Sequence, residues 1–259
     1  MSCFENATTA GRNLNLMKIN SSGKTDIGLR RKNNEDAYLV SPDLDFVVVA
    51  DGIGGSEAGE IASSIFIEAA LEVFGQKSQL FESETSLLIR EVFLLGNERI
   101  LAHVEKHPHC QGMGCTAEVI AFANDSYTVG HVGDSRTYHF RDGELRQITK
   151  DHSLVQKQVE QGLISREEAK KHYLRNIILR AVGISPSIEL DIIRGKILAG
   201  DIFLLCSDGL TDMVEDNSIQ EILVSTAAIT DKVEQLIESA KSAGGNDNIT
   251  VVLCRVSVA

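Results

Sequence analysis

The stretch Phe46-Val-Val-Val-Ala-Asp-Gly-Ile-Gly-Gly55 decides much of the fold. Its first five residues form a Val-rich apolar run, which predicts a strand buried on at least one face, with Asp51 at the end of that strand. The same pairing of an apolar run with an acid recurs at 127–132 with Asp134, at 202–206 with Asp208, and at Asp247 with 249–253. Any one of these acids is explained by a simple Asp-Gly turn, but their repetition favours a shared site at the rim of a sheet.

Carboxylates that gather at a sheet rim need a counter-ion. Two unpaired carboxylates about 4 Å apart repel each other by roughly 1 kcal/mol in water, and by about 4 kcal/mol at an effective dielectric constant of about 20. Mg²⁺ or Mn²⁺ meets this need, because hard cations prefer oxygen ligands. The segment Arg31-Lys-Asn-Asn-Glu-Asp36 adds two adjacent acids and an arginine. The residues therefore predict a divalent-metal site.

Ordered motifs along the chain resemble those of the protein phosphatase 2C family, over roughly Lys18 to Val258. The matching segments are Arg31 to Asp36, Ala50 to Gly55, Gly112 to Thr116, Gly133 to Arg136, Thr149 to Ser153, Ser207 to Asp212 and Asp247 to Thr250. Each motif is weak alone, but their order over nearly the whole chain is specific. The resemblance is closest to the compact bacterial members, which consist of a single catalytic domain with a short flap segment.

This resemblance implies a site with two ions, Mn²⁺ or Mg²⁺. Asp51 matches the carboxylate that bridges both ions, and Gly52 matches the residue that supplies a carbonyl oxygen. Asp208 and Asp247 match the residues that complete the coordination of one ion. Glu35 matches a ligand of the other ion, either directly or through water.

The same resemblance implies the catalytic residues and a third ion. Arg31 matches the arginine that binds the substrate phosphate, and Asp36 matches the acid that holds metal-bound water or orients the nucleophile. Asp134, together with Asp208, matches a third and weaker metal site described for bacterial members. Asn248 is expected to support its neighbour Asp247 rather than to bind metal.

The order of elements favours an α+β fold, because blocks of strands alternate with blocks of helices. We expect strands at 26–29, 37–40, 46–50, 116–123, 127–132, 137–141, 145–148, 188–195, 202–206 and 249–256, and helices at 57–74, 85–104 and within 218–243. The resemblance implies two antiparallel sheets packed as a central sandwich, with helices on both sides (αββα). Residues 18–258 would form one catalytic domain, after an extension at 1–17 of unknown role.

A polar insert at 152–180 interrupts the strand pattern. Ser153 to Gln161 reads as a helix, and Ser165 with Glu168 forms a capping-box pattern that predicts the start of a second one. The residues alone leave open a surface helical hairpin with no special role. The resemblance instead implies a flap beside the active site that is involved in substrate handling.

Net charge, cysteine content and apolar segments limit the possible partners and the cellular location of the protein. The net charge of −12 argues against nucleic acid and against an anionic membrane surface. Five cysteines, an odd number without Cys-x-x-Cys spacing, indicate reduced thiols in a cytoplasmic protein. Residues 1–17 lack the apolar core of a signal peptide, and no apolar run is long enough to span a membrane. We expect a cytoplasmic monomer.

Other short motifs in the chain would indicate different functions. No cysteine is followed six positions later by arginine, so a cysteine-phosphatase loop is absent. Asp43-Leu-Asp45 imitates the nucleophile motif of dehalogenase-type phosphatases, although Ser41-Pro42 precedes it where a buried strand is required. Ser22 to Thr25 imitates the end of a nucleotide-binding P-loop but lacks its opening glycine. His103, His107, His109 and Cys110 offer ligands that zinc accepts, but His103 and His107 fall at the polar end of an expected helix, which argues against a zinc site.

We interpret the chain as a metal-dependent protein serine/threonine phosphatase in which metal-activated water attacks phosphoserine or phosphothreonine. Its partners would be phosphoprotein substrates in signalling, the targets of an opposing Ser/Thr kinase. Two alternatives remain at this point: an inactive phosphatase-like module that binds phosphoproteins, and a dehalogenase-type phosphatase with Asp43 as nucleophile. Turnover of p-nitrophenyl phosphate with Mn²⁺ separates the first alternative from an active enzyme.

Overall fold

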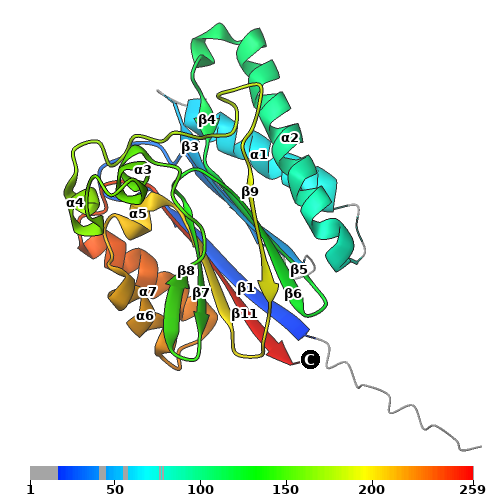
Figure 1. The fold of residues 1–259 in the computed structure, drawn as a ribbon, viewed down its shortest axis with the longest axis vertical. Helices are drawn as coiled ribbons and strands as arrows, with labels where there is room; N and C mark the ends of the chain where they lie inside the picture. The colour runs from blue at the N-terminus through cyan, green and yellow to red at the C-terminus, as the bar shows by residue number, and fades with distance from the viewer. Residues whose placement is uncertain (1–16, 41–44, 55–57, 76, 78, 259) are drawn as a thin grey trace, which may run out of the picture.

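Two antiparallel sheets pack face to face in the computed structural model, which describes residues 17–40, 45–54, 58–75, 77 and 79–258 (Figure 1). The first sheet has the order β1-β11-β10-β7-β8. Its strands are β1 (Met17–Asp26), β7 (Arg136–Arg141), β8 (Glu144–Gln147), β10 (Ile202–Cys206) and β11 (Ile249–Val258). The tight turn between β7 and β8 uses Asp142 and Gly143 with φ of 54° and 84°, as expected for an Asp-Gly hairpin.

The second sheet has the order β2-β3-β5-β6-β9, and a short strand β4 pairs with β3. Its strands are β2 (Asp36–Leu39), β3 (Phe46–Ile53), β4 (Gly114–Cys115), β5 (Ala117–Ala123), β6 (Ser126–Val132) and β9 (Asp191–Lys196). Apart from Asp51 and Glu118, β3 and β5 are apolar or small on both faces, because one face meets the other sheet and the opposite face meets helices.

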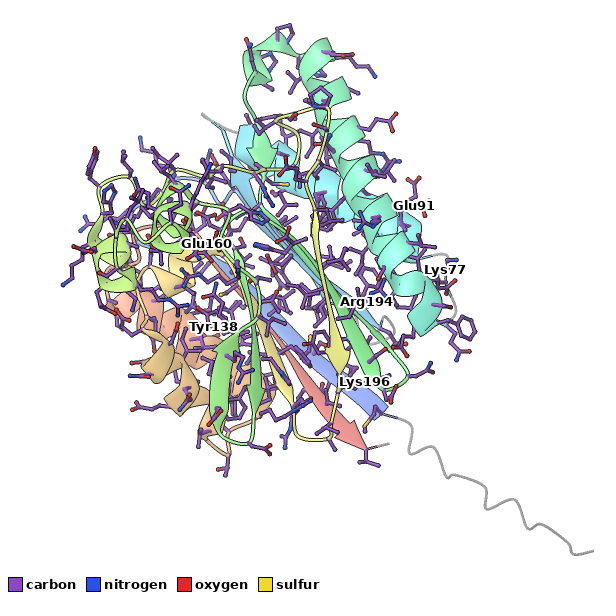
Figure 2. All side chains as sticks on the ribbon, in the orientation of Figure 1. Lys77, Glu91, Tyr138, Glu160, Arg194 and Lys196 are labelled. Atoms are coloured by element: carbon purple, nitrogen blue, oxygen red, sulfur yellow. The ribbon has the colours of Figure 1, made fainter. Side chains whose placement is uncertain are left out.

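Helices cover the outer face of each sheet. The second sheet is covered by α1 (Ala58–Phe74) and α2 (Glu82–Lys106), followed by the short 3-10 helix η1 (Pro108–Cys110). The first sheet is covered by α5 (Asp208–Thr211), α6 (Asp216–Val224) and α7 (Ile229–Ser242). Side chains fill the space between the sheets and beneath both helical layers (Figure 2). The predicted αββα sandwich is confirmed.

The insert at 152–180 forms the two predicted helices, α3 (Leu154–Glu160) and α4 (Arg166–Lys171), beside α5 (Figure 1). Ser153 caps α3 by accepting a hydrogen bond from the Gln156 N–H. Ser165 and Glu168 form the predicted capping box at the start of α4. The helical interpretation of this segment is confirmed.

The expected first strand at 26–29 is wrong, because the strand runs from Met17 to Asp26 and residues 28–30 form a turn. Among the described strands, β1 lies at the edge of its sheet and pairs only with β11, so it carries polar residues such as Lys18 and Asn20, and its sequence shows little apolar pattern. Ser22 to Thr25 therefore lie within a strand, which excludes a P-loop there.

In the described part of the chain, no helix has both the length and the apolar character needed to cross a bilayer.

Candidate active site

The acids predicted from the sequence lie where strands of the two sheets begin or end. Asp51 is near the end of β3, directly opposite Asp36 at the start of β2. Asp208 follows β10 as the first residue of α5, and Asp247 precedes β11, the neighbour of β10. Asp134 lies in the turn between β6 and β7. The two sheets therefore bring these five residues to one end of the sandwich.

The electrostatics of Asp51 show that these carboxylates form one cluster. Burial raises the pKa of Asp51 well above its usual value, and the charges of Asp36, Asp208, Asp134 and Asp247 raise that pKa further. Burial likewise raises the pKa of Asp208, again with four neighbouring aspartates contributing. Such a cluster favours a bound cation, because a positive charge relieves both the desolvation cost and the mutual repulsion.

Asp36 is held by hydroxyl groups from the first sheet. Its Oδ2 accepts hydrogen bonds from Ser207 Oγ at 2.7 Å and from Thr250 Oγ1 at 2.6 Å. Thr250 is itself 2.7 Å from the hydroxyl of Thr25, which accepts a hydrogen bond from Asn34. Burial raises the pKa of Asp36 to about 6, although the two hydroxyl donors oppose this rise. Asp36 is therefore a fixed, buried carboxylate.

Arg31 lies at the cluster, as expected, and pairs with a predicted metal ligand. Its Nη2 is 2.6 Å from Asp247 Oδ2. The side chains of Arg31 and Asp247 are 51% and 32% exposed, so solvent weakens the pair and both groups remain free to exchange partners.

Asn248 has a wider role than the expected support of Asp247. Its backbone N–H donates to Asp247 Oδ1 at 2.8 Å. Its side-chain oxygen accepts from the Glu35 N–H, and its amide donates to the carbonyls of Ile27 and Asn33. Asn248 thus fixes the loop that carries Arg31 and Glu35.

Two glycines let the first turn of α1 close on Glu35. The Gly52 N–H donates to the Glu35 carbonyl at 3.1 Å. A Cβ on Gly52 would collide with the carbonyl of Gly59, and a Cβ on Gly59 would collide with the Glu35 carboxylate. Burial raises the pKa of Glu35, and Arg31 opposes this shift. The site thus excludes side chains at both glycines.

Asp134 carries a buried oxygen without a partner. Its Oδ1 makes no hydrogen bond within the described residues, and the side chain is only 8% exposed. Burial raises the pKa of Asp134 to about 7, with a further rise from the charge of Asp151. An unsatisfied buried carboxylate oxygen is costly, and a metal ion or ordered water is the usual partner for such a group.

The donor set fits hard divalent cations, since the residues that gather here all offer oxygen. Within the described ranges, however, no three His, Cys, Asp or Glu side chains converge closely enough to enclose one ion. Sites for Mg²⁺ and Mn²⁺ commonly complete their shells with water and carbonyl oxygens, and Gly52 offers such a carbonyl. The cluster is thus a group of acids compatible with hydrated ions rather than a closed protein cage.

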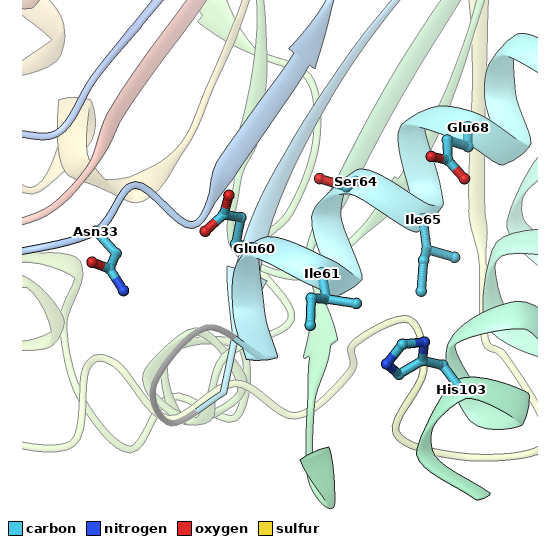
Figure 3. A pocket seen from close by; sticks show the side chains of 7 residues that line it. All are labelled: Asn33, Glu60, Ile61, Ser64, Ile65, Glu68 and His103. Atoms are coloured by element: carbon cyan, nitrogen blue, oxygen red, sulfur yellow. The ribbon is translucent and has the colours of Figure 1, made fainter. Parts of the chain in front are cut away.

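A groove of about 500 Å³ lies on the exposed face of α1. It is lined by Asn33, Glu60, Ile61, Ser64, Ile65, Glu68 and His103. Figure 3 shows Ile61 and Ile65 projecting from α1 on the side of His103, which belongs to α2. A second cavity, of about 610 Å³, lies at the base of the insert and is lined by His152, Lys157 and Arg180 among others.

The competing motifs gain no support from the described residues. His103 stacks on His107, which meets His109 edge to face, but these histidines form no metal-binding group with Cys110 there. Asp43 lies outside the described residues. The cysteines Cys110, Cys115, Cys206 and Cys254 are buried and free, as expected for reduced thiols.

Several hydroxyl groups were given no role in the sequence analysis. Thr116 accepts a hydrogen bond from the Asp51 N–H and lies 2.6 Å from the hydroxyl of Ser135. Ser207 and Thr250 hold Asp36. All four residues belong to or adjoin the quoted motifs, so position within a motif was the available signal, but the sequence alone did not reveal their hydrogen-bond partners.

Comparison with known proteins identifies the family of this chain. The family model described as "Protein phosphatase 2C" matches residues 30–254. Serine/threonine phosphatase stp of Listeria monocytogenes is 37% identical over 234 residues, which cover 89% of this chain and 93% of that protein. The crystal structure of serine/threonine phosphatase PstP/Ppp from Mycobacterium tuberculosis has 38% identity and a TM-score of 0.87, covering 92% of this chain and 99% of that one.

A further structure of the PstP catalytic domain, in complex with two manganese ions, has 38% identity and a TM-score of 0.85, with 93% of this chain and 99% of that chain covered. The family model spans the segments that hold every acid of the cluster. Fold and sequence agree, and the chain belongs to the protein phosphatase 2C family.

Proposed function

We propose that the acidic cluster is the metal centre of a phosphatase that hydrolyses phosphoserine and phosphothreonine in proteins with water as the nucleophile. Family membership makes the chain a metal-dependent protein serine/threonine phosphatase. The observation that supports the cluster as its centre is the set of mutually interacting aspartates at the shared rim of the two sheets. Asp51, Asp208 and Asp247 are the proposed ligands, together with Glu35 and the Gly52 carbonyl.

When bound, two divalent ions lower the pKa of water and neutralise charge on the phosphoryl oxygens. The protein's own residues supply orientation. Asp36 is fixed by Ser207 and Thr250, so it is placed to accept a hydrogen bond from the attacking water. Asp51 is fixed through its backbone by Thr116. We assign Asp134, with its unpartnered oxygen, to a third and weaker ion.

Arg31 is the proposed phosphate ligand, because its guanidinium is half exposed and its only charged partner among the described residues is Asp247. Arg31→Ala should mainly raise KM for phosphosubstrates, by about 1.5–3 kcal/mol of lost charge-assisted hydrogen bonding. Arg31→Lys should recover only part of that loss, since an ammonium group cannot reproduce the two-pronged geometry. Steady-state kinetics on a phosphopeptide measure both effects, and an unchanged KM in Arg31→Ala would remove Arg31 from the site.

The segment 152–180 is proposed as a substrate-handling flap. Its two ends hydrogen-bond to each other, from Leu154 N–H to the Ile177 carbonyl at 2.9 Å and from Leu179 N–H to the His152 carbonyl at 2.7 Å. Arg175 reaches Asp212 beyond α5 at 3.3 Å. The flap thus forms a closed lobe beside Asp208 but contributes no acid of the cluster.

Replacing Gln161 to Lys171 with a short Gly-Ser linker should lower kcat/KM on phosphopeptides at least about tenfold more than on p-nitrophenyl phosphate. The small substrate engages little beyond its phosphoryl group, whereas a peptide can use remote contacts at the reacting centre. Parallel assays of both substrates with Mn²⁺ measure the difference. Equal losses on both substrates, with metal affinity intact, would rule out a substrate-selective flap.

The proposal extends to the location of the enzyme, its oligomeric state and the kinase that it opposes. The free, buried cysteines support a reducing compartment, so we place the enzyme in the cytoplasm as a monomer acting against a Ser/Thr kinase. Residues 18–258 act as one catalytic domain. Mn²⁺-dependent release of phosphate from a phosphothreonine peptide by the intact chain tests the function. Tight peptide binding without turnover, with either Mn²⁺ or Mg²⁺, would instead support the inactive binding module.

A further inference from the structure

A buried charged pair between the sheets is not used by the proposed chemistry. Glu118 on β5 and His131 on β6 are register partners, and both side chains are completely buried. The Glu118 carboxylate contacts His131 Nδ1 and accepts a hydrogen bond from the Thr137 hydroxyl. His131 Nε2 is 2.7 Å from the Lys150 carbonyl, two residues before the flap. The pair therefore forms a fixed platform beneath the start of the flap.

His152 packs against this platform and clamps Gly133. The imidazole rings of His131 and His152 are 4.4 Å apart. His152 Nδ1 accepts the Gly133 N–H at 3.1 Å, while the His152 N–H donates to the Gly133 carbonyl at 2.6 Å. Because Nδ1 is an acceptor, a neutral His152 carries its ring proton on Nε2, which lies 3.3 Å from Asp191 Oδ2 and 3.2 Å from Arg180 Nη1.

The clamped glycine directly precedes Asp134. Gly133 has a φ of +116°, a conformation that favours glycine, and a Cβ there would collide with Thr116. The turn is thus confined by Thr116 on one side and by His152 on the other, which leaves little freedom for the Asp134 carboxylate. The carbonyl of His152 also accepts the hydrogen bond from Leu179 that closes the flap. One residue therefore joins the Asp134 turn to both ends of the flap.

We propose that His152 is a positioning residue that fixes the Asp134 carboxylate through Gly133 and ties its position to that of the flap. The assignment of Asp134 to an ion rests on the proposed function, whereas the clamp on Gly133 rests on hydrogen bonds alone. Loss of the Nδ1 acceptor should make the turn more mobile and weaken binding of the ion at Asp134, without changing the binding of the ions at Asp51.

Two substitutions separate the clamp from simple packing. His152→Phe keeps a ring to pack against His131 but removes the acceptor. His152→Asn loses the ring, but its side-chain oxygen occupies the position of Nδ1 and keeps the acceptor. If the Phe variant does not fold, His152→Gln replaces it, because its carbonyl lies beyond the Nδ1 position.

Amide hydrogen exchange at Gly133 and calorimetric titration with Mn²⁺ provide readouts independent of activity. In His152→Phe we expect Gly133 exchange to accelerate at least about tenfold and the weakest Mn²⁺ dissociation constant to rise about tenfold. The tighter sites should keep their affinity. In His152→Asn both values should return toward those of the wild type, and in an Asp134→Ala background His152→Phe should change Mn²⁺ binding no further.

Unchanged Gly133 exchange in the folded Phe variant would overturn the clamp, as would failure of Asn to restore it. Equal weakening of all Mn²⁺ sites would also overturn it, since a positioning role is specific to Asp134. If the wild-type protein binds no Mn²⁺, the proposed function fails, while the Gly133 exchange comparison still decides whether the clamp exists.

Discussion

Asp51→Asn is expected to reduce Mn²⁺-dependent hydrolysis of p-nitrophenyl phosphate by at least about a thousandfold, or about 4 kcal/mol of transition-state stabilisation. Asn has the same shape but no charge, so the proposed bridging position loses the group that offsets two divalent ions. Asp208→Asn and Asp247→Asn should behave similarly. Phosphate release at saturating Mn²⁺ measures the loss.

The same variant should stay folded, and the pKa of Asp51 gives the reason. That pKa is raised above its unfolded value of about 3.8, so ionisation of Asp51 costs folding stability as the pH rises to neutrality. Removing the charge removes that cost. Without Mn²⁺, the Tm of Asp51→Asn at pH 7.5 should equal or exceed that of the wild type, whereas the rise in Tm on adding Mn²⁺ should be lost.

Asp43→Asn serves as the matched control, since it changes an acid of the neighbouring segment that has no assigned role. Its activity should match that of the wild type. Activity that survives Asp51→Asn but is lost in Asp43→Asn would contradict the assignment and support a dehalogenase-type nucleophile.

The sequence was informative where function and local pattern coincide. Asp51 and Asp208 follow apolar runs that must become buried strands, so their place at the sheet rim follows from the pattern itself. The capping box at Ser165 was predictable for the same reason, because all its determinants are local. The αββα arrangement and the role of each acid, by contrast, came from family resemblance.

Contacts between distant segments were not predictable from the residues. The pairing of Arg31 with Asp247 joins residues 216 positions apart, and the grip of Asn248 on the loop at 27–35 spans a similar separation. The pairing of Glu118 with His131 was unpredictable for a different reason. Glu118 lies within a strand whose other residues are apolar or small, and nothing local indicates that His131 will face it. Such partners are decided by strand register, which a single sequence leaves open.

The Glu118–His131 pair gives the second large expected effect. His131→Leu should lower the free energy of unfolding by about 3–5 kcal/mol, because it leaves the Glu118 carboxylate buried without its charged partner. Changing both residues to Leu should recover part of this loss, since no buried charge then remains. Urea unfolding of the two variants and the wild type at pH 6.5 measures both effects. A single-variant loss below about 1 kcal/mol would mean that Glu118 and His131 are both neutral in the folded protein.

The pH dependence of this pair tests its charge directly. Burial opposes the charged form of His131, but the Glu118 carboxylate outweighs burial and raises the pKa of His131 to about 9. A raised pKa contributes stability that is fully present below the unfolded value of about 6.5 and is lost as the pH rises through about 9. The shift corresponds to about 3 kcal/mol. The wild type should therefore lose stability relative to the double Leu variant between pH 6.5 and 9.5, and a constant difference over that range would show that His131 is neutral throughout.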